Sequence, residues 1–213
     1  MIRFITFEGG DGTGKTTQLK VLESYLIARG KSCISTREPG GTTLGKLIRR
    51  VLLEVGEQTI ASPTELFLYL ADRAQHIREV VRPAIEQGKI VLCDRHTDST
   101  LAYQGYGRGF DLGLLQELNK LASEGVKPDL TFLLDCPVEL GLARTAQRRF
   151  QTTADASWED RFERERIEFH HRVRAGFLEL ARTEPDRLRV IDASRSVTEV
   201  SEEIKKIVDQ ELA

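Results

Sequence analysis

A glycine-rich loop near the N-terminus constrains the fold of this chain more than any other feature. Residues 9–16, GGDGTGKT, match the phosphate-binding pattern of Gly, four residues, Gly, Lys and Thr. Glycines let backbone N–H groups turn inward around phosphate oxygens, and a helix that opens at Lys15 adds partial positive charge. The apolar residues 2–7 predict a buried strand directly before the loop. The alternative is a chance lysine in an ordinary turn, and the flanking strand and helix patterns argue against it.

Individual positions of this loop have distinct chemical roles. Lys15 supplies a mobile ammonium group for the β- and γ-phosphates of a nucleotide, and the Thr16 hydroxyl is placed to ligate magnesium. The candidate triphosphate-binding residues are Gly9, Gly10, Asp11, Gly12, Thr13, Gly14, Lys15, Thr16 and Thr17.

Length and charge narrow the possible classes of protein. The chain has 213 residues, which suits one α/β domain over residues 1–213. Its 31 Lys and Arg nearly balance 33 Asp and Glu, so neither nucleic acid nor a membrane is expected as a partner. We expect a cytoplasmic protein, because no signal peptide and no apolar run of about twenty residues is present. Cys33, Cys93 and Cys136 lack metal-ligand spacing and are expected to be reduced and buried.

Five apolar segments predict strands, and helical patterns separate them. The strands are expected at residues 2–7, 31–36, 89–95, 130–135 and 188–192. The helices are expected at residues 17–28, 44–53, 65–87, 112–123, 138–149, 158–182 and 197–212. This alternation predicts a three-layer α/β fold, in which a five-stranded parallel sheet lies between helices. Right-handed crossovers then place Lys15, Arg37, Asp94 and Arg95 at one edge of the sheet.

Charged residues at the predicted sheet edge indicate a second ligand. An acid such as Asp94 at a strand end is what a second metal-holding or water-holding motif requires in a phosphate-loop enzyme. A surface ion pair with Arg95 is the alternative, which the glycine-rich loop makes the weaker interpretation. Arg37, Arg73 and Arg95 could bind a second phosphorylated ligand, because a guanidinium forms two hydrogen bonds to phosphate. Any one of them could instead be a solvated surface residue.

An aromatic and polar set could bind a flat heterocycle. A base would stack on a ring while Gln104 reads its polar edge. Aromatic residues at helical spacing are more often core, and Phe67 is expected there. Tyr69 lies four residues before Arg73, so both can face one pocket from the same helix. The set comprises Phe67, Tyr69, Tyr103, Gln104 and Tyr106.

A polar segment without periodicity suits a mobile lid over about residues 144–160. Arginines on both sides of it could reach a charged transition state when the lid closes. A solvated helix face is the alternative, especially for the charges at residues 159–166. The flanking arginines are Arg144, Arg148, Arg149 and Arg161.

Together these motifs resemble the thymidylate kinases of the P-loop nucleoside monophosphate kinase family. The resemblance covers essentially the whole chain and rests on FEGGDGTGKTTQ at 7–18, TREPGGT at 36–42, LADRAQH at 70–76, DRHTDSTLAYQGYGRG at 94–109, PDLTFLLD at 128–135 and IDAS at 191–194. The loop alone would indicate only a nucleotide-binding protein. The resemblance implies a P-loop kinase fold with a lid and a homodimer that phosphorylates dTMP to dTDP with MgATP, in dTTP synthesis.

The resemblance also implies roles for residues around ATP. Lys15 and Thr16 would handle the ATP phosphates and Mg²⁺, and Asp94 would join the metal shell through water. Arg144 would lie against the adenine, and residues 191–194 would close the adenine pocket.

On the dTMP side, the resemblance implies that Arg37 and Arg95 grip the phosphate, with Arg95 also near the transferred group. Asp11 would contact the region of the sugar 3′-hydroxyl. The thymine would be bound by the remaining matching residues, Tyr69, Arg73, Thr100 and Gln104. Tyr69 stands where the family commonly has a stacking Phe, so its hydroxyl needs a partner.

Residues 10–13 contain no arginine, as in the bacterial-type arrangement of the family, so the resemblance implies that the lid supplies a catalytic arginine. Either Arg148 or Arg149 could fill that role. The expected catalytic groups are Lys15, Arg95, Arg148 and Arg149.

Two alternative functions remain at this point. Another nucleoside monophosphate kinase or a deoxynucleoside kinase would share the chemistry, although the pair Arg37 and Arg95 favours a phosphorylated acceptor. A P-loop ATPase switch would share the loop but needs no second pocket lined with arginine. The apolar face at residues 66–77 fits either a dimer or the core, and the Glu38–Pro39 peptide bond could be cis or trans.

Overall fold

The computed structural model describes residues 2–53, 60–151, 162 and 165–212, without the side chains of residues 148–151. Its centre is one parallel sheet in the order β2-β3-β1-β4-β5. The strands are β1 (Phe4–Glu8), β2 (Cys33–Arg37), β3 (Ile90–Asp94), β4 (Leu130–Asp135) and β5 (Leu188–Asp192). The predicted five-stranded parallel α/β fold is confirmed.

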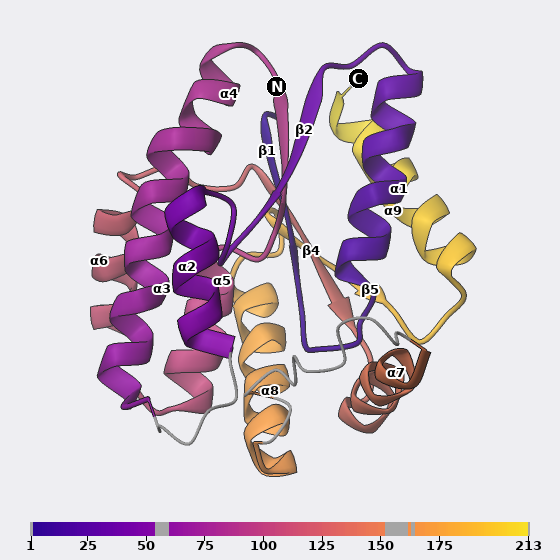
Figure 1. Cartoon of the computed structure of the whole chain (residues 1–213). Helices are drawn as coiled ribbons and strands as arrows, with labels where there is room; N and C mark the ends of the chain where they lie inside the picture. The colour runs from indigo at the N-terminus through magenta and orange to yellow at the C-terminus, as the bar shows by residue number, and fades with distance from the viewer. Residues whose placement is uncertain (1, 54–59, 152–161, 163–164, 213) are drawn as a thin grey trace.

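Helices cover both faces of the sheet (Figure 1). On one side lie α1 (Lys15–Ala28) and α9 (Val197–Leu212), which pack against each other. The other side carries α3 (Ser62–His76), the π-helical η1 (Ile77–Val81), α4 (Arg82–Glu86), α5 (Thr97–Thr100), the π-helical η2 (Leu101–Gly107), α6 (Leu112–Ala122) and α8 (Ile167–Thr183). The remaining helices are α2 (Thr43–Leu53), beside α3, and α7 (Val138–Gln151). Within the described residues, no helix combines the length and apolar character needed to cross a bilayer.

Alternation along the strands gives the sheet a hydrophobic core on each of its faces. Ile5 and Phe7 of β1 point to the face covered by α1 and α9, and Phe132 of β4 joins them there. Phe4 of β1 and Val91 of β3 point to the opposite face and pack on η1 and α4. Because a strand buried on both faces needs apolar residues at successive positions, these segments read as continuous apolar runs.

Two expectations about helices need correction. Phe67 is 62% exposed and does not belong to the core, because it lies on the outer side of α3. Of the helix expected at residues 158–182, residues 158–161, 163 and 164 lie outside the described residues, Glu165 and Arg166 are not helical, and α8 begins at Ile167. The helix expected at residues 65–87 is confirmed, because α3, η1 and α4 follow one another without a break, and Pro83 lies in the first turn of α4.

The burial of Phe132 provides a test of the fold. Its side chain is fully buried and its ring lies 5.5 Å from that of Phe7. We expect Phe132→Ala to lower the free energy of unfolding by about 3–5 kcal/mol, through lost apolar burial and a residual cavity. Urea unfolding followed by circular dichroism measures this. Ile27→Ala, at a residue of α1 that is 58% exposed, is the control and should change stability by less than about 0.5 kcal/mol. Equal effects would contradict this packing.

Candidate active site

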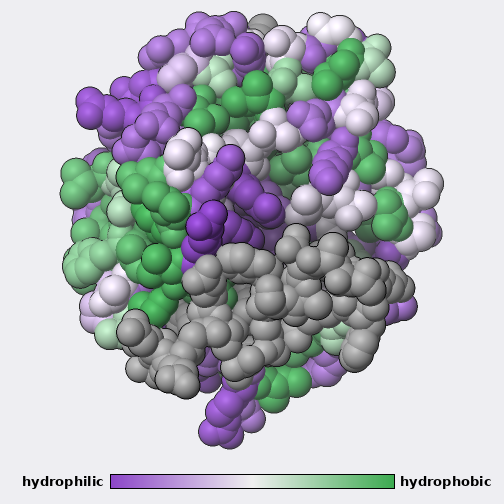
Figure 2. Space-filling view, in the orientation of Figure 1, coloured by the Kyte–Doolittle hydropathy of each residue, from purple (hydrophilic) through white to green (hydrophobic). Residues whose placement is uncertain are grey.

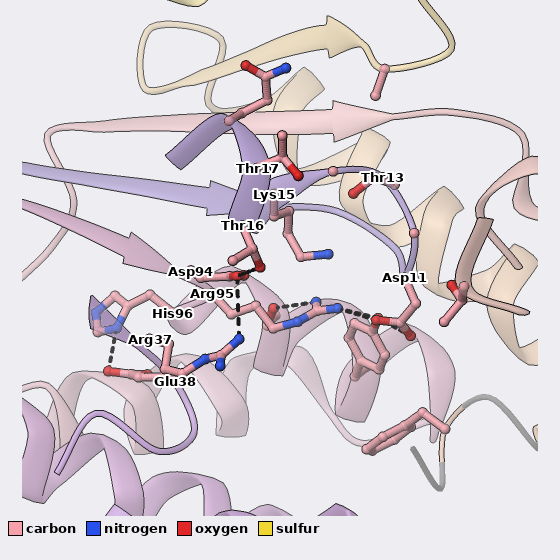
Figure 3. A pocket seen from close by; sticks show the side chains of 18 of the residues that line it. Asp11, Thr13, Lys15, Thr16, Thr17, Arg37, Glu38, Asp94, Arg95 and His96 are labelled. Carbon is pink, nitrogen blue, oxygen red and sulfur yellow. Dashed lines mark hydrogen bonds and ion pairs between the residues drawn. The ribbon is translucent and has the colours of Figure 1, made fainter. Parts of the chain in front are cut away.

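A single cavity of about 710 Å³ opens at the carboxyl edge of the sheet and collects the predicted residues from distant segments (Figure 3). Its lining includes Asp11, Gly12, Thr13, Gly14, Lys15, Thr16, Thr17, Arg37, Tyr69, Arg73, Asp94, Arg95, Thr100, Gln104 and Arg144. Gly9 and Gly10 line a smaller cavity of about 30 Å³ behind the loop. The side chains of Arg148 and Arg149 lie outside the described residues.

The loop between β1 and α1 is built for close approach of backbone atoms. Gly12 has a φ of 72°, and a Cβ added there would lie 1.9 Å from the carbonyl oxygen of Gly141 on α7. No other residue type fits this position without moving α7, because both the backbone angle and the contact require glycine. The tip of the loop is therefore packed directly on the helix that carries Arg144.

Lys15 is folded back onto the loop that precedes it. Its Nζ donates to the carbonyl oxygens of Gly9 (3.1 Å) and Gly10 (2.6 Å), and the residue is 7% exposed. Burial, helped by the nearby positive charge of Arg95, lowers the pKa of Lys15 to about 8, against the opposing pull of Asp11 and nearby acids. An approaching phosphate would stabilise the charged form.

Thr16, Asp94 and Arg37 meet where α1, β3 and β2 come together. The Thr16 hydroxyl donates to Oδ2 of Asp94 at 2.5 Å, and Nη2 of Arg37 lies 3.8 Å from the same oxygen. The Arg37 side chain is 45% exposed, so its guanidinium is available at the mouth of the cavity. The oxygens of Thr16 and Asp94 are of the kind that bind a hard cation such as Mg²⁺, and the Arg37 guanidinium lies beside them.

Arg95 joins the loop to the opposite wall of the cavity. Its guanidinium donates to the Gly9 carbonyl oxygen (3.0 Å), to Oδ1 of Asp11 (2.6 Å) and to the Tyr103 hydroxyl (3.1 Å), and Figure 3 shows it reaching toward Asp11. Burial alone would raise the pKa of Asp11, but Arg95 and Lys15 outweigh it and lower that pKa. Both carboxylate and guanidinium are therefore charged at neutral pH.

Arg73 is buried in the wall rather than solvated. Only 2% of its surface is exposed, and Nε donates to Glu38 at 2.8 Å. Nη1 donates to Thr100 (3.0 Å) and Asn119 (2.6 Å), and Nη2 donates to the His96 carbonyl oxygen (3.0 Å). These bonds fix the plane of the guanidinium, so few of its N–H groups remain for a ligand.

Glu38 is the acceptor at the centre of this wall. Its Oε1 is 2.8 Å from Nδ1 of His76 and 3.0 Å from Nδ1 of His96. Burial alone would raise its pKa, but His96 and Arg73, with the His76 bond, hold the pKa of Glu38 well below its usual range. Burial lowers the pKa of His96, which favours its neutral form. The following Glu38–Pro39 bond is cis.

The residues expected to bind a base contact other side chains of the protein. Nε2 of Gln104 donates to the buried Glu65 at 2.8 Å, and Arg108 also contacts Glu65. The ring of Tyr69 lies 6.4 Å from that of Phe162, so the aromatic wall includes a residue from the region between α7 and α8. Glu65 therefore fixes the orientation of the Gln104 amide toward the cavity.

At the other end of the cavity, Arg144 of α7 donates to the carbonyl oxygens of Ala193 (2.7 Å) and Ser194 (3.4 Å). These bonds tie α7 to the turn after β5, which the resemblance had linked to an adenine pocket.

Sequence reasoning missed several lining or supporting residues, namely Arg49, Ser99, Asn119, Phe162 and Arg195. Only Ser99 lay within a recognised motif.

Comparisons with known proteins agree with this geometry. The sequence profile of a family described as "Thymidylate kinase" matches residues 7–204. The chain belongs to the thymidylate kinase family. It is 53% identical to a thymidylate kinase of Desulfovibrio desulfuricans over 92% of this chain and 90% of the relative. It is 50% identical to that of Geotalea uraniireducens over 99% and 98%, respectively.

A solved structure supports the same family. The thymidylate kinase of Ehrlichia chaffeensis superposes with a TM-score of 0.75 at 37% identity, over 97% of this chain and 98% of that chain. The predicted resemblance to thymidylate kinases is confirmed, and neither a different kinase nor an ATPase switch is favoured.

The ion pair between Arg73 and Glu38 provides a test of the wall. We expect Glu38→Gln to lower the free energy of unfolding by roughly 3–5 kcal/mol near pH 7, because it leaves Arg73 buried without its carboxylate. The low pKa of Glu38 makes this contribution fully present above about pH 4.5, the usual pKa of Glu, and lost as the pH falls through the folded-state pKa. Urea unfolding between pH 5 and 7 measures it. Glu179→Gln, at an exposed ion pair with Arg182, is the control and should leave the midpoint unchanged. Equal midpoints for wild type and Glu38→Gln would contradict the account.

Proposed function

We propose that this enzyme transfers the γ-phosphoryl group of MgATP to the 5′-phosphate of dTMP, yielding dTDP. The observation that carries this proposal is the contact of Arg95 with the loop, since its Nη1 lies 3.0 Å from the Gly9 carbonyl oxygen. An arginine that can hold an acceptor phosphate therefore borders the loop that would hold the donor triphosphate. The whole-length match to thymidylate kinases supports dTMP as that acceptor.

Catalysis would depend on positioning and charge neutralisation. The acceptor phosphate is already anionic near neutral pH, so no strong general base is needed. Lys15 and Arg95 would neutralise charge on the transferred group, and Arg37 would bind the acceptor phosphate from the mouth of the cavity. Exclusion of water by the enclosing walls would limit hydrolysis of ATP.

The donors near the loop fit a magnesium ion. Thr16 and Asp94 present hydroxyl and carboxylate oxygens 2.5 Å apart, and Mg²⁺ in kinases takes few protein oxygens together with phosphates and waters. No group of three His, Cys, Asp or Glu side chains is arranged to hold a metal among the described residues, so a full protein cage is not available there. Bound magnesium would neutralise phosphate charge.

The remaining site residues have roles on the substrate side or at the adenine. Tyr69 would stack on the thymine, while Arg73, Thr100 and Gln104 would bind its polar edge. The wall already uses four of the five N–H groups of Arg73, so the remaining Nη2 N–H would donate to the base, and the fixed Arg73 and Gln104 side chains would lose little entropy on binding. Asp11 would contact the sugar. Arg144 would lie against the adenine, and either Arg148 or Arg149 would act from the lid.

The surface supports a homodimer. Exposed apolar side chains gather on α2, α3 and α6, and Figure 2 shows green over the region where Figure 1 draws these helices. They are Leu44, Leu47, Val51, Phe67, Leu114 and Leu121. Leu44, Leu47 and Val51 follow helical spacing and so share one face of α2, which a second copy of the chain would cover. We also propose a cytoplasmic location, because the three cysteines are all unpaired.

The loop lysine gives a direct test of the chemistry. We expect Lys15→Met to reduce kcat at least a thousandfold while the urea midpoint changes little, because the charge that faces the transferred phosphate is lost. Coupled ADP release with MgATP and dTMP measures the rate. Lys20→Met, at an exposed residue of the same helix, should retain the wild-type rate. A near-normal rate for Lys15→Met would refute its assigned role.

The apolar surface gives a second test. Leu47→Glu should convert a dimer into a monomer in sedimentation velocity, because it places a charge in the buried interface. Ile27→Glu, at a similarly exposed residue on α1, is the matched control and should leave the dimer intact. A wild-type monomer, or dissociation by both variants alike, would refute this interface.

A further inference from the structure

A buried carboxylate at the end of β1 faces the backbone that carries Arg95. Glu8 is completely buried, and its Oε1 accepts hydrogen bonds from the backbone N–H groups of His96 (2.7 Å) and Ser99 (3.3 Å). Its Oε2 accepts a third bond from the Ser99 hydroxyl at 2.5 Å. One side chain of the loop-bearing strand therefore holds the first turn of α5.

The Ser99 hydroxyl connects Glu8 to the guanidinium of Arg95. Nη1 of Arg95 donates to Oγ of Ser99 at 3.2 Å, while that hydroxyl gives its own hydrogen to Glu8. A hydroxyl has one hydrogen and two lone pairs, so the bond that commits its hydrogen to Glu8 leaves a lone pair free to accept from Arg95. The orientation of Ser99 thus depends on a carboxylate at Glu8.

The backbone of Arg95 needs such support. Its φ is 72°, in the left-handed region that residues other than glycine rarely adopt. Its N–H donates to the Phe7 carbonyl oxygen at 3.0 Å, and the next N–H, of His96, donates to Glu8. Conformations of this kind persist when several surrounding contacts determine them together.

We propose that Glu8 is a positioning residue for Arg95, which it holds through the Ser99 hydroxyl and the backbone of residues 96–99. This inference rests on the proposed role of Arg95 in binding the phosphate of dTMP. Glu8 itself does not line the main cavity. It acts from behind the wall, and its ionised form is the one that orders the guanidinium.

The charges around Glu8 make its positioning of Arg95 dependent on pH. Burial, followed by the repulsion of Asp98, raises the pKa of Glu8 to about 7, although Ser99, Arg95 and the His96 N–H pull it down. Asp98 of α5 is itself paired with Arg187 at 2.7 Å. The other titratable neighbours are Lys15 of the loop and Cys93 of β3. Protonation of Glu8 at Oε2 would remove the acceptor that holds the Ser99 hydroxyl hydrogen away from Arg95.

A double-mutant cycle tests the inference through kcat/KM for dTMP. Glu8→Gln should lower kcat/KM about ten- to a hundredfold, as a small displacement of a reacting group does. In an Arg95→Lys background the same substitution should cost less than about threefold, because the group it positions is gone. Ser99→Ala should show a smaller loss with the same dependence on Arg95, which keeps the test valid if Glu8→Gln does not fold.

The pH profile supplies an independent measurement. The ratio of wild-type to Glu8→Gln kcat/KM cancels the titration of dTMP. It should rise with pH through about 7, because only the wild-type enzyme has a carboxyl group at residue 8 that ionises in this range. Thr6→Val is the control, because it removes a buried bond to Thr131 from the same strand. Its ratio should stay flat. The inference would be overturned, with the proposed role of Arg95 intact, if the ratio of wild-type to Glu8→Gln kcat/KM stayed flat with pH. The same conclusion would follow if the full loss of kcat/KM from Glu8→Gln persisted in the Arg95→Lys background. An Arg95→Lys enzyme with normal kcat/KM would instead refute the proposed role of Arg95, and the inference with it.

Discussion

The parallel pairing of β1 with β3 decides where the groups of this site lie. In its register Phe7 lies opposite Asp94, so both strands reach the sheet edge together. The glycine-rich loop begins two residues after Phe7, and Arg95 directly follows Asp94, the last residue of β3. The N–H of Arg95 then bonds to the Phe7 carbonyl oxygen, which extends the pairing by one residue. The loop that would bind the phosphoryl donor and the arginine that would bind the phosphoryl acceptor are therefore adjacent before any ligand binds.

The strong charges around this junction are arranged as compensating pairs. Arg95 faces Asp11, and Arg73 faces Glu38, so little net charge is buried without a partner. Such pairs contribute less to stability than to a fixed geometry, because burying each ion costs several kcal/mol that its partner must offset. Arg37 and Lys15 are held more loosely, since Arg37 is 45% exposed and lies 3.8 Å from its partner Asp94, while Lys15 rests on carbonyl oxygens. These two are the cations best able to turn toward phosphate.

Much of the fold could be predicted from the sequence, because buried parallel strands and a phosphate loop leave clear local signals. The expected strand at residues 188–192 and helix at residues 197–212 coincide with β5 and α9. Local patterns could not locate the start of α8, since the charges before Ile167 look equally helical. Nor could they place Phe67, because exposure depends on which side of α3 the neighbouring helices cover.

The site was predictable where motifs carry it and not where tertiary contacts do. Convergence of the loop with Asp94 and Arg95 follows from topology alone. The bonds of Arg73 to Asn119 and of Gln104 to Glu65 join different helices, and no spacing in the sequence indicates them. The same is true of Phe162, whose ring lies 6.4 Å from that of Tyr69 and which the sequence placed only within an expected helix at residues 158–182.

The measurement that tests the central claim most directly is acceptor-dependent ADP release from MgATP, comparing dTMP with dUMP, thymidine and no acceptor. The account predicts strong stimulation by dTMP, little by thymidine, which lacks the phosphate for Arg37 and Arg95, and a low rate without acceptor. Turnover that is equally fast without an acceptor, or with thymidine, would contradict a site built to hold two phosphorylated ligands side by side.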